Sequence, residues 1–160
     1  MSSSLSDFRP EKALNDVHVL VVDDDLRIAK LVRSVLEGLG FQHVRLCHDG
    51  SEALEVLKNE TVDMVICDWQ MEPMSGLSMV EYVRSPQSPC LRIPVIMLSG
   101  NSERPQVEIA RDSGVTEYVM KPFTAKSLCS RIVAAIDHPR SFILSKNFSG
   151  PNRRRKKVAV

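Results

Sequence analysis

The chain has 160 residues, 43% of them hydrophobic, which is enough for one compact domain with an appendage. Its four cysteines are scattered without a C-x-x-C pair, so the spacing offers neither a zinc site nor a disulfide framework and favours a reducing compartment. No apolar run approaches about 18 residues, so no membrane span is predicted. The first residues lack the apolar core of a signal peptide, and a cytoplasmic protein is expected.

The net charge of +1 conceals an asymmetry along the chain. Residues 1–138 hold 14 of the 21 Lys and Arg residues and all 20 Asp and Glu residues, a net charge of −6. Residues 139–160 hold the other seven basic residues and no acid. An acidic body with a basic arm suggests that the arm has an anionic partner.

Five short apolar runs predict the strands of a sheet. They span residues 17–22, 42–47, 63–67, 93–99 and 116–120, and several are nearly continuous and rich in Val and Ile. Such runs are typical of strands buried on both faces. Because they alternate with helical patterns over short connections, we expect a parallel sheet covered by helices on both sides.

The segments between the runs predict five helices. In the first, apolar residues recur at helical spacing from Ile28 to Leu39, with Asp25 as the N-cap and Gly40 at the end. The other predicted helices cover residues 52–59, 77–84, 105–113 and about 124–137. Residues 1–14 are expected to be disordered.

Polar residues follow the predicted strands at the points where each strand ends. They are Asp23 and Asp24, Asp68, Ser99 and Lys121. Ligands bind beyond the carboxyl ends of the strands in open parallel sheets, so we expect these side chains to meet on one rim. Clustered carboxylates repel one another, and a bound Mg²⁺ with oxygen ligands would relieve the repulsion. One carboxylate could then act as a nucleophile toward a phosphoryl group, with Ser99 and Lys121 holding its oxygens.

The segments VVDDD, CDWQM, MLSG and YVMKPF resemble the receiver domains of two-component response regulators, of the CheY-like kind, over roughly residues 16–137. The resemblance implies an α/β flavodoxin-like, doubly wound sheet with strand order 2-1-3-4-5. It implies that Asp68 accepts the phosphoryl group from a histidine kinase or phosphotransferase. It further implies that Asp23, Asp24, Asp68 and the Gln70 carbonyl hold Mg²⁺.

The same resemblance assigns the remaining pocket residues. Ser99 and Lys121 would hold the phosphoryl group, with a cis bond between Lys121 and Pro122. Tyr118 would rotate inward when Ser99 moves; the alternative is a plain surface aromatic. The protein would be a phosphoryl acceptor and not a turnover enzyme. A receiver that has lost phosphorylation remains an alternative, since fold does not guarantee function.

One departure from the family pattern lies in the loop after the acceptor. The family has Pro four residues after the acceptor, whereas this chain has Glu72 there, followed by Pro73. Gly76 keeps its usual distance, so the loop length is unchanged. We expect an altered turn and an intact acceptor.

The segment after residue 138 is too short for a DNA-binding output domain, which would need a core of its own. Gly150-Pro151 predicts a turn, and five consecutive cations run from Arg153 to Lys157. The pattern R-S-F-I-x-S-x-x-F-x-G-P-x-R-R-R, from Arg140 to Arg155, resembles the arginine-rich tail of the Cle family, which are CheY-like cyclic-di-GMP-binding regulators of the flagellar motor. The domain prediction is therefore a receiver over residues 15–138 and a flexible basic tail over residues 139–160.

The resemblance implies a tail that is disordered when free and folds around cyclic di-GMP. Its candidate ligands are Arg140, Ser141, Ser145, Asn152, Arg153, Arg154 and Arg155. An acidic residue often stands at the position of Asn152, and Asn offers one acceptor oxygen and no charge, so weaker binding is expected. The implied output is a contact with the flagellar motor switch at the cell pole. Two alternatives stay open, namely an inert tail and a tail that contacts nucleic acid without sequence specificity.

Overall fold

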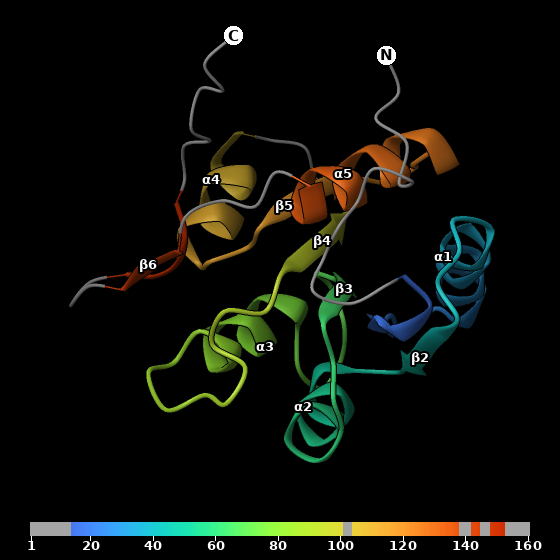
Figure 1. The fold of residues 1–160 in the computed structure, drawn as a ribbon. Helices are drawn as coiled ribbons and strands as arrows, with labels where there is room; N and C mark the ends of the chain where they lie inside the picture. The colour runs from blue at the N-terminus through green and yellow to red at the C-terminus, as the bar shows by residue number, and fades with distance from the viewer. Residues whose placement is uncertain (1–13, 101–103, 138–141, 145–147, 153–160) are drawn as a thin grey trace, which may run out of the picture.

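A five-stranded parallel sheet forms the centre of the molecule in the computed structural model, which describes residues 14–100, 104–137, 142–144 and 148–152 (Figure 1). The strand order is β2-β1-β3-β4-β5, as predicted for a flavodoxin-like fold. The strands are β1 His18–Val22, β2 His43–Cys47, β3 Met64–Asp68, β4 Val95–Ser99 and β5 Glu117–Met120. All four pairings between them are parallel, so the carboxyl ends of the strands share one edge.

Four helices connect the strands of this sheet and a fifth follows β5, and their ends follow the predicted signals. They are α1 Leu26–Gly38, α2 Gly50–Asn59, α3 Gly76–Val83, α4 Arg104–Asp112 and α5 Ala125–Asp137. The Asp25 side chain accepts a hydrogen bond from the Arg27 amide and caps α1. Gly40 and Gly114, just beyond α1 and α4, have φ of 107° and 100°, which favours glycine. None of the helices in the described ranges is long and apolar enough to cross a membrane.

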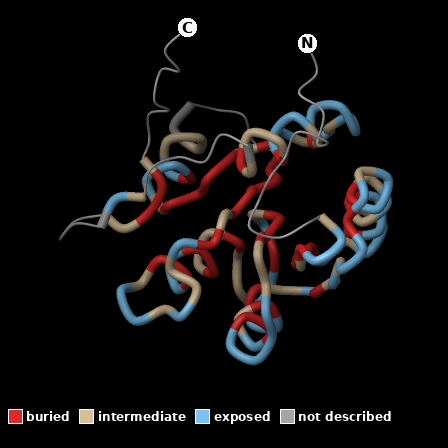
Figure 2. Tube along the Cα trace, in the orientation of Figure 1, coloured by how far each residue is buried: buried red, intermediate tan, exposed pale blue. Residues whose placement is uncertain are grey.

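Alternate residues of each strand supply two separate cores, one on each face of the sheet. Leu20 and Val22 pack with apolar residues of α2 and α3. Val19 and Val21 pack with α1 and with Leu128, Ile132 and other residues of α5. Figure 2 shows the buried strands between helices whose outer sides are exposed. This burial on both faces explains why the strands read as continuous apolar runs.

The N-terminal boundary differs slightly from the prediction. Leu14, expected in a disordered segment, begins the short 3-10 helix η2 (Leu14–Asp16) and packs against the core on the α1 side of the sheet. Residues 1–13 lie outside the described residues.

The chain after α5 also differs from the prediction of a flexible tail. Strands β6 (Phe142–Leu144) and β7 (Ser149–Pro151) form a two-stranded antiparallel sheet, with Phe142 opposite Pro151. The predicted turn at Gly150-Pro151 is therefore wrong, because both residues belong to β7, where they are buried. Residues 142–144 and 149–151 are therefore structured. A flexible tail was predicted because basic, polar terminal segments usually lack a folded structure.

The β6–β7 hairpin rests on two arginines of the receiver body. The ring of Phe142 lies with its centroid 5.7 Å from the guanidinium carbon of Arg84 and 4.8 Å from that of Arg92. Both distances are within the range of cation–π attraction. The hairpin is thereby held next to the loop between α3 and β4.

Candidate functional site

An acidic cluster lies at the carboxyl edge of the sheet, as the sequence predicted. Asp23 and Asp24 follow β1, and Asp68 ends β3. Because β1 and β3 are neighbours with Val22 paired to Cys67, residues 45 positions apart in the chain meet at this edge. Carboxylate oxygens of the three residues lie within 4.8 Å of one another. This separation lets a single cation contact all three.

Lys121 balances part of this negative charge. Its ammonium nitrogen lies 3.1 Å from an Asp68 oxygen and 3.5 Å from an Asp23 oxygen. Burial raises the pKa of both Asp23 and Asp68, because it disfavours their charged forms. Burial alone would lower the pKa of Lys121, but its hydrogen bond and attraction to Asp68 and its attraction to Asp23 raise it overall. The site therefore holds a partly buried cation against two carboxylates. Any further positive charge would stabilise the charged forms of these carboxylates.

Ser99 and Lys121 approach the cluster from neighbouring strands. Ser99 ends β4 and is buried, and its carbonyl accepts a hydrogen bond of 2.7 Å from the Lys121 amide. The Lys121-Pro122 bond is cis, which confirms the prediction. The four strand ends that the sequence analysis singled out are thus brought together.

The loop after β3 is held close to Asp68 by Gly76. A Cβ at this position would overlap the backbone carbonyl oxygen of Asp68, and the Gly76 amide donates to the Trp69 carbonyl at 2.8 Å. Gln70 is exposed in the same loop. The Glu72-Pro73 bond, at the departure from the family pattern, is cis.

Trp69 is a residue that the sequence analysis missed. It directly follows Asp68 and meets the ring of Tyr118 edge to face, with centroids 6.4 Å apart. Tyr118 is half-buried on β5. The available signal was that Trp69 is the only tryptophan in the chain.

Arg84 was also missed, because an arginine at the end of a predicted helix is usually exposed to solvent. Here it is buried, and its guanidinium donates to the carbonyl of Gly114 at 2.9 Å and to that of Leu91 at 2.6 Å. A longer contact of 3.4 Å reaches the Thr116 hydroxyl. Burial lowers the pKa of Arg84 to about 10, so it stays charged at neutral pH. Arg84 thus joins α3 to the loops before β4 and β5, and carries Phe142 of the hairpin.

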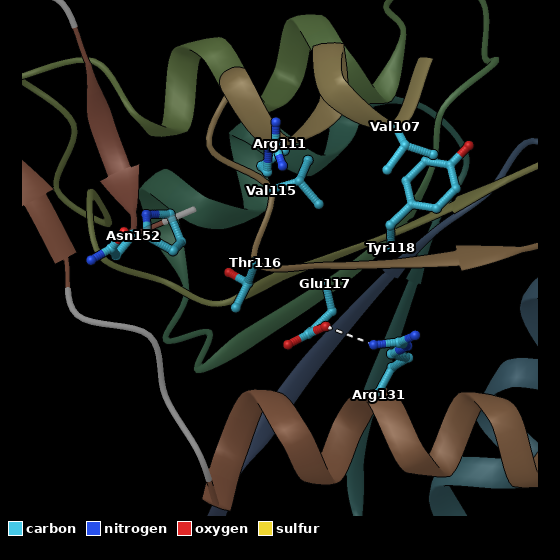
Figure 3. Close-up of a pocket in the computed structure, with 9 residues that line it drawn as sticks. Val107, Arg111, Val115, Thr116, Glu117, Tyr118, Arg131 and Asn152 are labelled. Carbon is cyan, nitrogen blue, oxygen red and sulfur yellow. Dashed lines mark hydrogen bonds and ion pairs between the residues drawn. The ribbon is translucent and has the colours of Figure 1, made fainter. Parts of the chain in front are cut away.

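Most of the predicted tail ligands lie outside the described residues, namely Arg140, Ser141, Ser145, Arg153, Arg154 and Arg155. Asn152 is described, and it lines a cavity together with residues of α4, β5 and α5 (Figure 3). Asn152 is thus the one predicted tail ligand among the described residues, and its role as a ligand stays a prediction.

The sequence comparisons agree with this geometry. A family model described as response regulator receiver domain matches residues 19–133. Chemotaxis protein CheY-3 of Vibrio cholerae is 33% identical over 123 residues, which cover 76% of this chain and 94% of that protein. Chemotaxis protein CheY of Pseudomonas aeruginosa is 33% identical over 114 residues, which cover 71% of this chain and 91% of that protein.

Solved structures show the same similarity. The chemotaxis response regulator CheY4 of Vibrio cholerae matches with a TM-score of 0.67 at 30% identity, over 72% of this chain and 95% of that one. The receiver domain of the Francisella response regulator 1452 matches with a TM-score of 0.68 at 29% identity, over 76% of this chain and 98% of that one. The chain therefore belongs to the response regulator receiver domain family.

Proposed function

We propose that Asp68 accepts a phosphoryl group and that the phosphorylated chain controls the docking of a protein partner. The observation that carries the proposal is the cluster of three carboxylates within 4.8 Å of one another, with the Lys121 ammonium 3.1 Å from Asp68. Members of the receiver family are phosphoryl acceptors in two-component signalling and not turnover enzymes.

The acidic cluster fits Mg²⁺. Its donors are all carboxylate oxygens, Asp24 is exposed, and Asp23 and Asp68 are buried, so the site combines hard ligands with access for water. We infer that Asp23, Asp24 and Asp68, with the Gln70 carbonyl, hold the ion. When bound, Mg²⁺ supplies positive charge that neutralises the phosphoryl oxygens.

The transfer assigns a role to each remaining residue. An oxygen of Asp68 forms a bond to phosphorus while the bond from phosphorus to the donor's imidazole nitrogen breaks, and that nitrogen keeps the electron pair. Lys121 pairs with the phosphoryl oxygens, and the Ser99 hydroxyl donates to them. In this proposal Tyr118 turns inward with Ser99 and changes the surface formed by α4, β5 and α5.

Phosphorylation is tested with a small acyl phosphate as donor in the presence of Mg²⁺. Wild type should form a phosphoprotein that alkali and hydroxylamine cleave, seen as a shifted band on a phosphate-affinity gel, and Asp68→Asn should not. The control is Asp49→Asn, because Asp49 caps α2 and Asn caps equally well. Equal labelling of wild type and Asp68→Asn would refute Asp68 as the acceptor.

The proposed donor is a histidine kinase or phosphotransferase, and the proposed output is the flagellar motor switch, with recruitment from the cytoplasm to the cell pole. Two relatives that match most of the chain are named chemotaxis proteins, which supports this direction. Binding of purified motor switch protein should change when Asp68 is phosphorylated. Equal binding by the phosphorylated and unphosphorylated protein would contradict the proposed output and leave Asp68 as the proposed acceptor.

We also propose that the basic arm binds cyclic di-GMP and acts as a second input on the same docking surface. Five consecutive cations follow Asn152, and arginine both pairs with phosphates and stacks on bases. Calorimetry of the intact chain with cyclic di-GMP should give heat, and Arg153→Ala and Arg154→Ala should weaken binding. No heat with wild type would favour an inert arm. Binding that ignores base identity and falls steeply with salt would favour nucleic-acid contact.

A further inference from the structure

A cavity of about 340 Å³ opens beside β5, the edge strand of the sheet, and none of its lining residues belongs to the acidic cluster (Figure 3). Helices α4 and α5 lie on its two sides, and the end of β7 closes one end. Its lining is Val107, Arg111, Val115, Thr116, Glu117, Tyr118, Arg131, Pro151 and Asn152. Its volume is near the lower limit of small-molecule sites, so it suits a group the size of one nucleotide.

The charged groups of the cavity come from three different elements. Arg111 projects from α4 and Arg131 from α5, so two guanidinium groups approach from opposite walls. The carboxylate of Glu117, on β5 between them, is buried and lies 3.4 Å from an Arg131 nitrogen. Two cations and one buried carboxylate leave the cavity with a net positive charge. A ligand that carries negative charge together with hydrogen-bond donors would match this pattern.

The cavity also provides surfaces for a flat ring. The Tyr118 ring lies toward Val107 at one side, and arginine planes stand on both walls. Nucleobases stack on aromatic rings and on guanidinium planes. The lining residues Val107, Val115 and Pro151 add apolar contact. The cavity therefore combines stacking surfaces with phosphate-binding groups.

The C-terminal hairpin completes the cavity. Pro151 and Asn152 can line it because Phe142 rests on Arg84 and Arg92, and because Gly150 lies against the Gly114 backbone. The run of cations from Arg153 to Lys157 follows Asn152 directly in the sequence. This basic run of the sequence therefore begins next to a residue that lines the cavity.

We propose that this cavity binds one guanine nucleotide half of cyclic di-GMP, with Glu117 as the acceptor for the guanine edge. The inference rests on the proposed nucleotide binding by the arm and names a second part of that site. Guanine carries N1–H and N2–H donors that a carboxylate accepts together, whereas adenine presents a bare N1 acceptor at the same place. A carboxylate has about four acceptor positions, so one that pairs with a cation can accept further hydrogen bonds.

Glu117 thereby supplies the carboxylate that Asn152, as an amide, does not. Arg111 and Arg131 are placed to contact the phosphate or to stack on the base. The cavity volume admits one half of the dinucleotide and leaves the second half outside it.

The test is calorimetry with cyclic di-GMP and with cyclic di-AMP on the intact chain and on Glu117→Gln, Arg111→Ala and Arg131→Ala. Each variant should bind cyclic di-GMP about 10- to 100-fold more weakly, the range expected when a hydrogen bond to a charged group is lost. Glu117→Gln should also lose preference for guanine over adenine. The control Arg45→Ala removes an exposed guanidinium from β2, at the opposite edge of the sheet, and should bind as wild type does.

Labelling of Asp68 by the acyl phosphate donor shows that each variant is folded, because the acidic cluster does not include the altered residues. If wild type binds and Arg153→Ala weakens binding while the three cavity variants bind normally, the cavity inference is overturned and nucleotide binding by the arm stands. If wild type itself does not bind, both proposals fall. Trp69 fluorescence offers a second readout, because Trp69 contacts the Tyr118 ring.

Discussion

Gly150 of β7 lies directly against Gly114, the glycine that follows α4. A Cβ on Gly150 would stand 2.9 Å from the Gly114 Cα. Real Cβ atoms do not approach a backbone atom this closely, so the hairpin docks here only because Gly150 lacks a side chain. The C-terminal hairpin is therefore fitted to the receiver body.

Gly150→Ala is expected to displace the hairpin and to lower the free energy of unfolding by about 1–3 kcal/mol, because the added carbon overpacks a backbone contact. Urea unfolding measures the change. The control is Gly38→Ala, where a Cβ would meet nothing within 4 Å and where helix propensity favours Ala by up to about 1 kcal/mol. Equal stability of the two variants would contradict the close contact.

Phe142→Ala should destabilise the protein by about 1–3 kcal/mol, because it removes the ring that contacts Arg84 and Arg92. Ile143→Ala changes the next residue of β6, which is exposed, and should change stability by less than about 1 kcal/mol. Thermal unfolding of both variants checks the order. A larger effect at Ile143 would show that the hairpin is held by another contact.

Asp23→Asn is expected to stabilise the protein by about 1 kcal/mol at pH 7 in the absence of divalent ions. Because burial raises the pKa of Asp23 in the folded state, its stabilising contribution is present at low pH and is lost as the pH rises through that raised value. Asn removes the charge and keeps the oxygen that accepts from the Asp25 amide.

In the presence of Mg²⁺, wild type should become more stable than Asp23→Asn. Binding to the native state raises the melting temperature of wild type, and the variant should gain less because it lacks one carboxylate ligand. Calorimetric scans of both proteins with and without Mg²⁺ test the two expected stability orders. An equal magnesium response in both proteins would exclude Asp23 from the metal site.

Thiol reactivity should divide the four cysteines. Burial raises the pKa of Cys47 to about 11 and raises that of Cys67 further, so both stay protonated and slow to react at pH 8. Cys90 and Cys129 are half-buried and should react first. Alkylation of the folded protein followed by peptide mass spectrometry identifies the order. Rapid labelling of Cys67 would contradict the burial of β3.

Much of the fold followed from local patterns. Burial on both faces made the strands continuous apolar runs, and Asp25 and Gly40 marked the ends of α1 by capping and by positive φ. The acidic cluster was equally predictable, because parallel strands place residues such as Asp24 and Asp68 at one edge. The docking of the β6–β7 hairpin was not, since its contacts with Arg84, Arg92 and Gly114 join residues far apart in the chain.

The sequence by itself determined the sheet, its helices and the polar residues at the strand ends, because periodicity, capping and parallel pairing are local or follow from topology. Only the tertiary structure decided that Arg84 is buried under Phe142, that Gly150 fits against Gly114, and that Glu117 faces a cavity beside Asn152. The physical reason is that these contacts depend on the packing of side chains from distant segments. Local sequence patterns do not predict contacts of this kind.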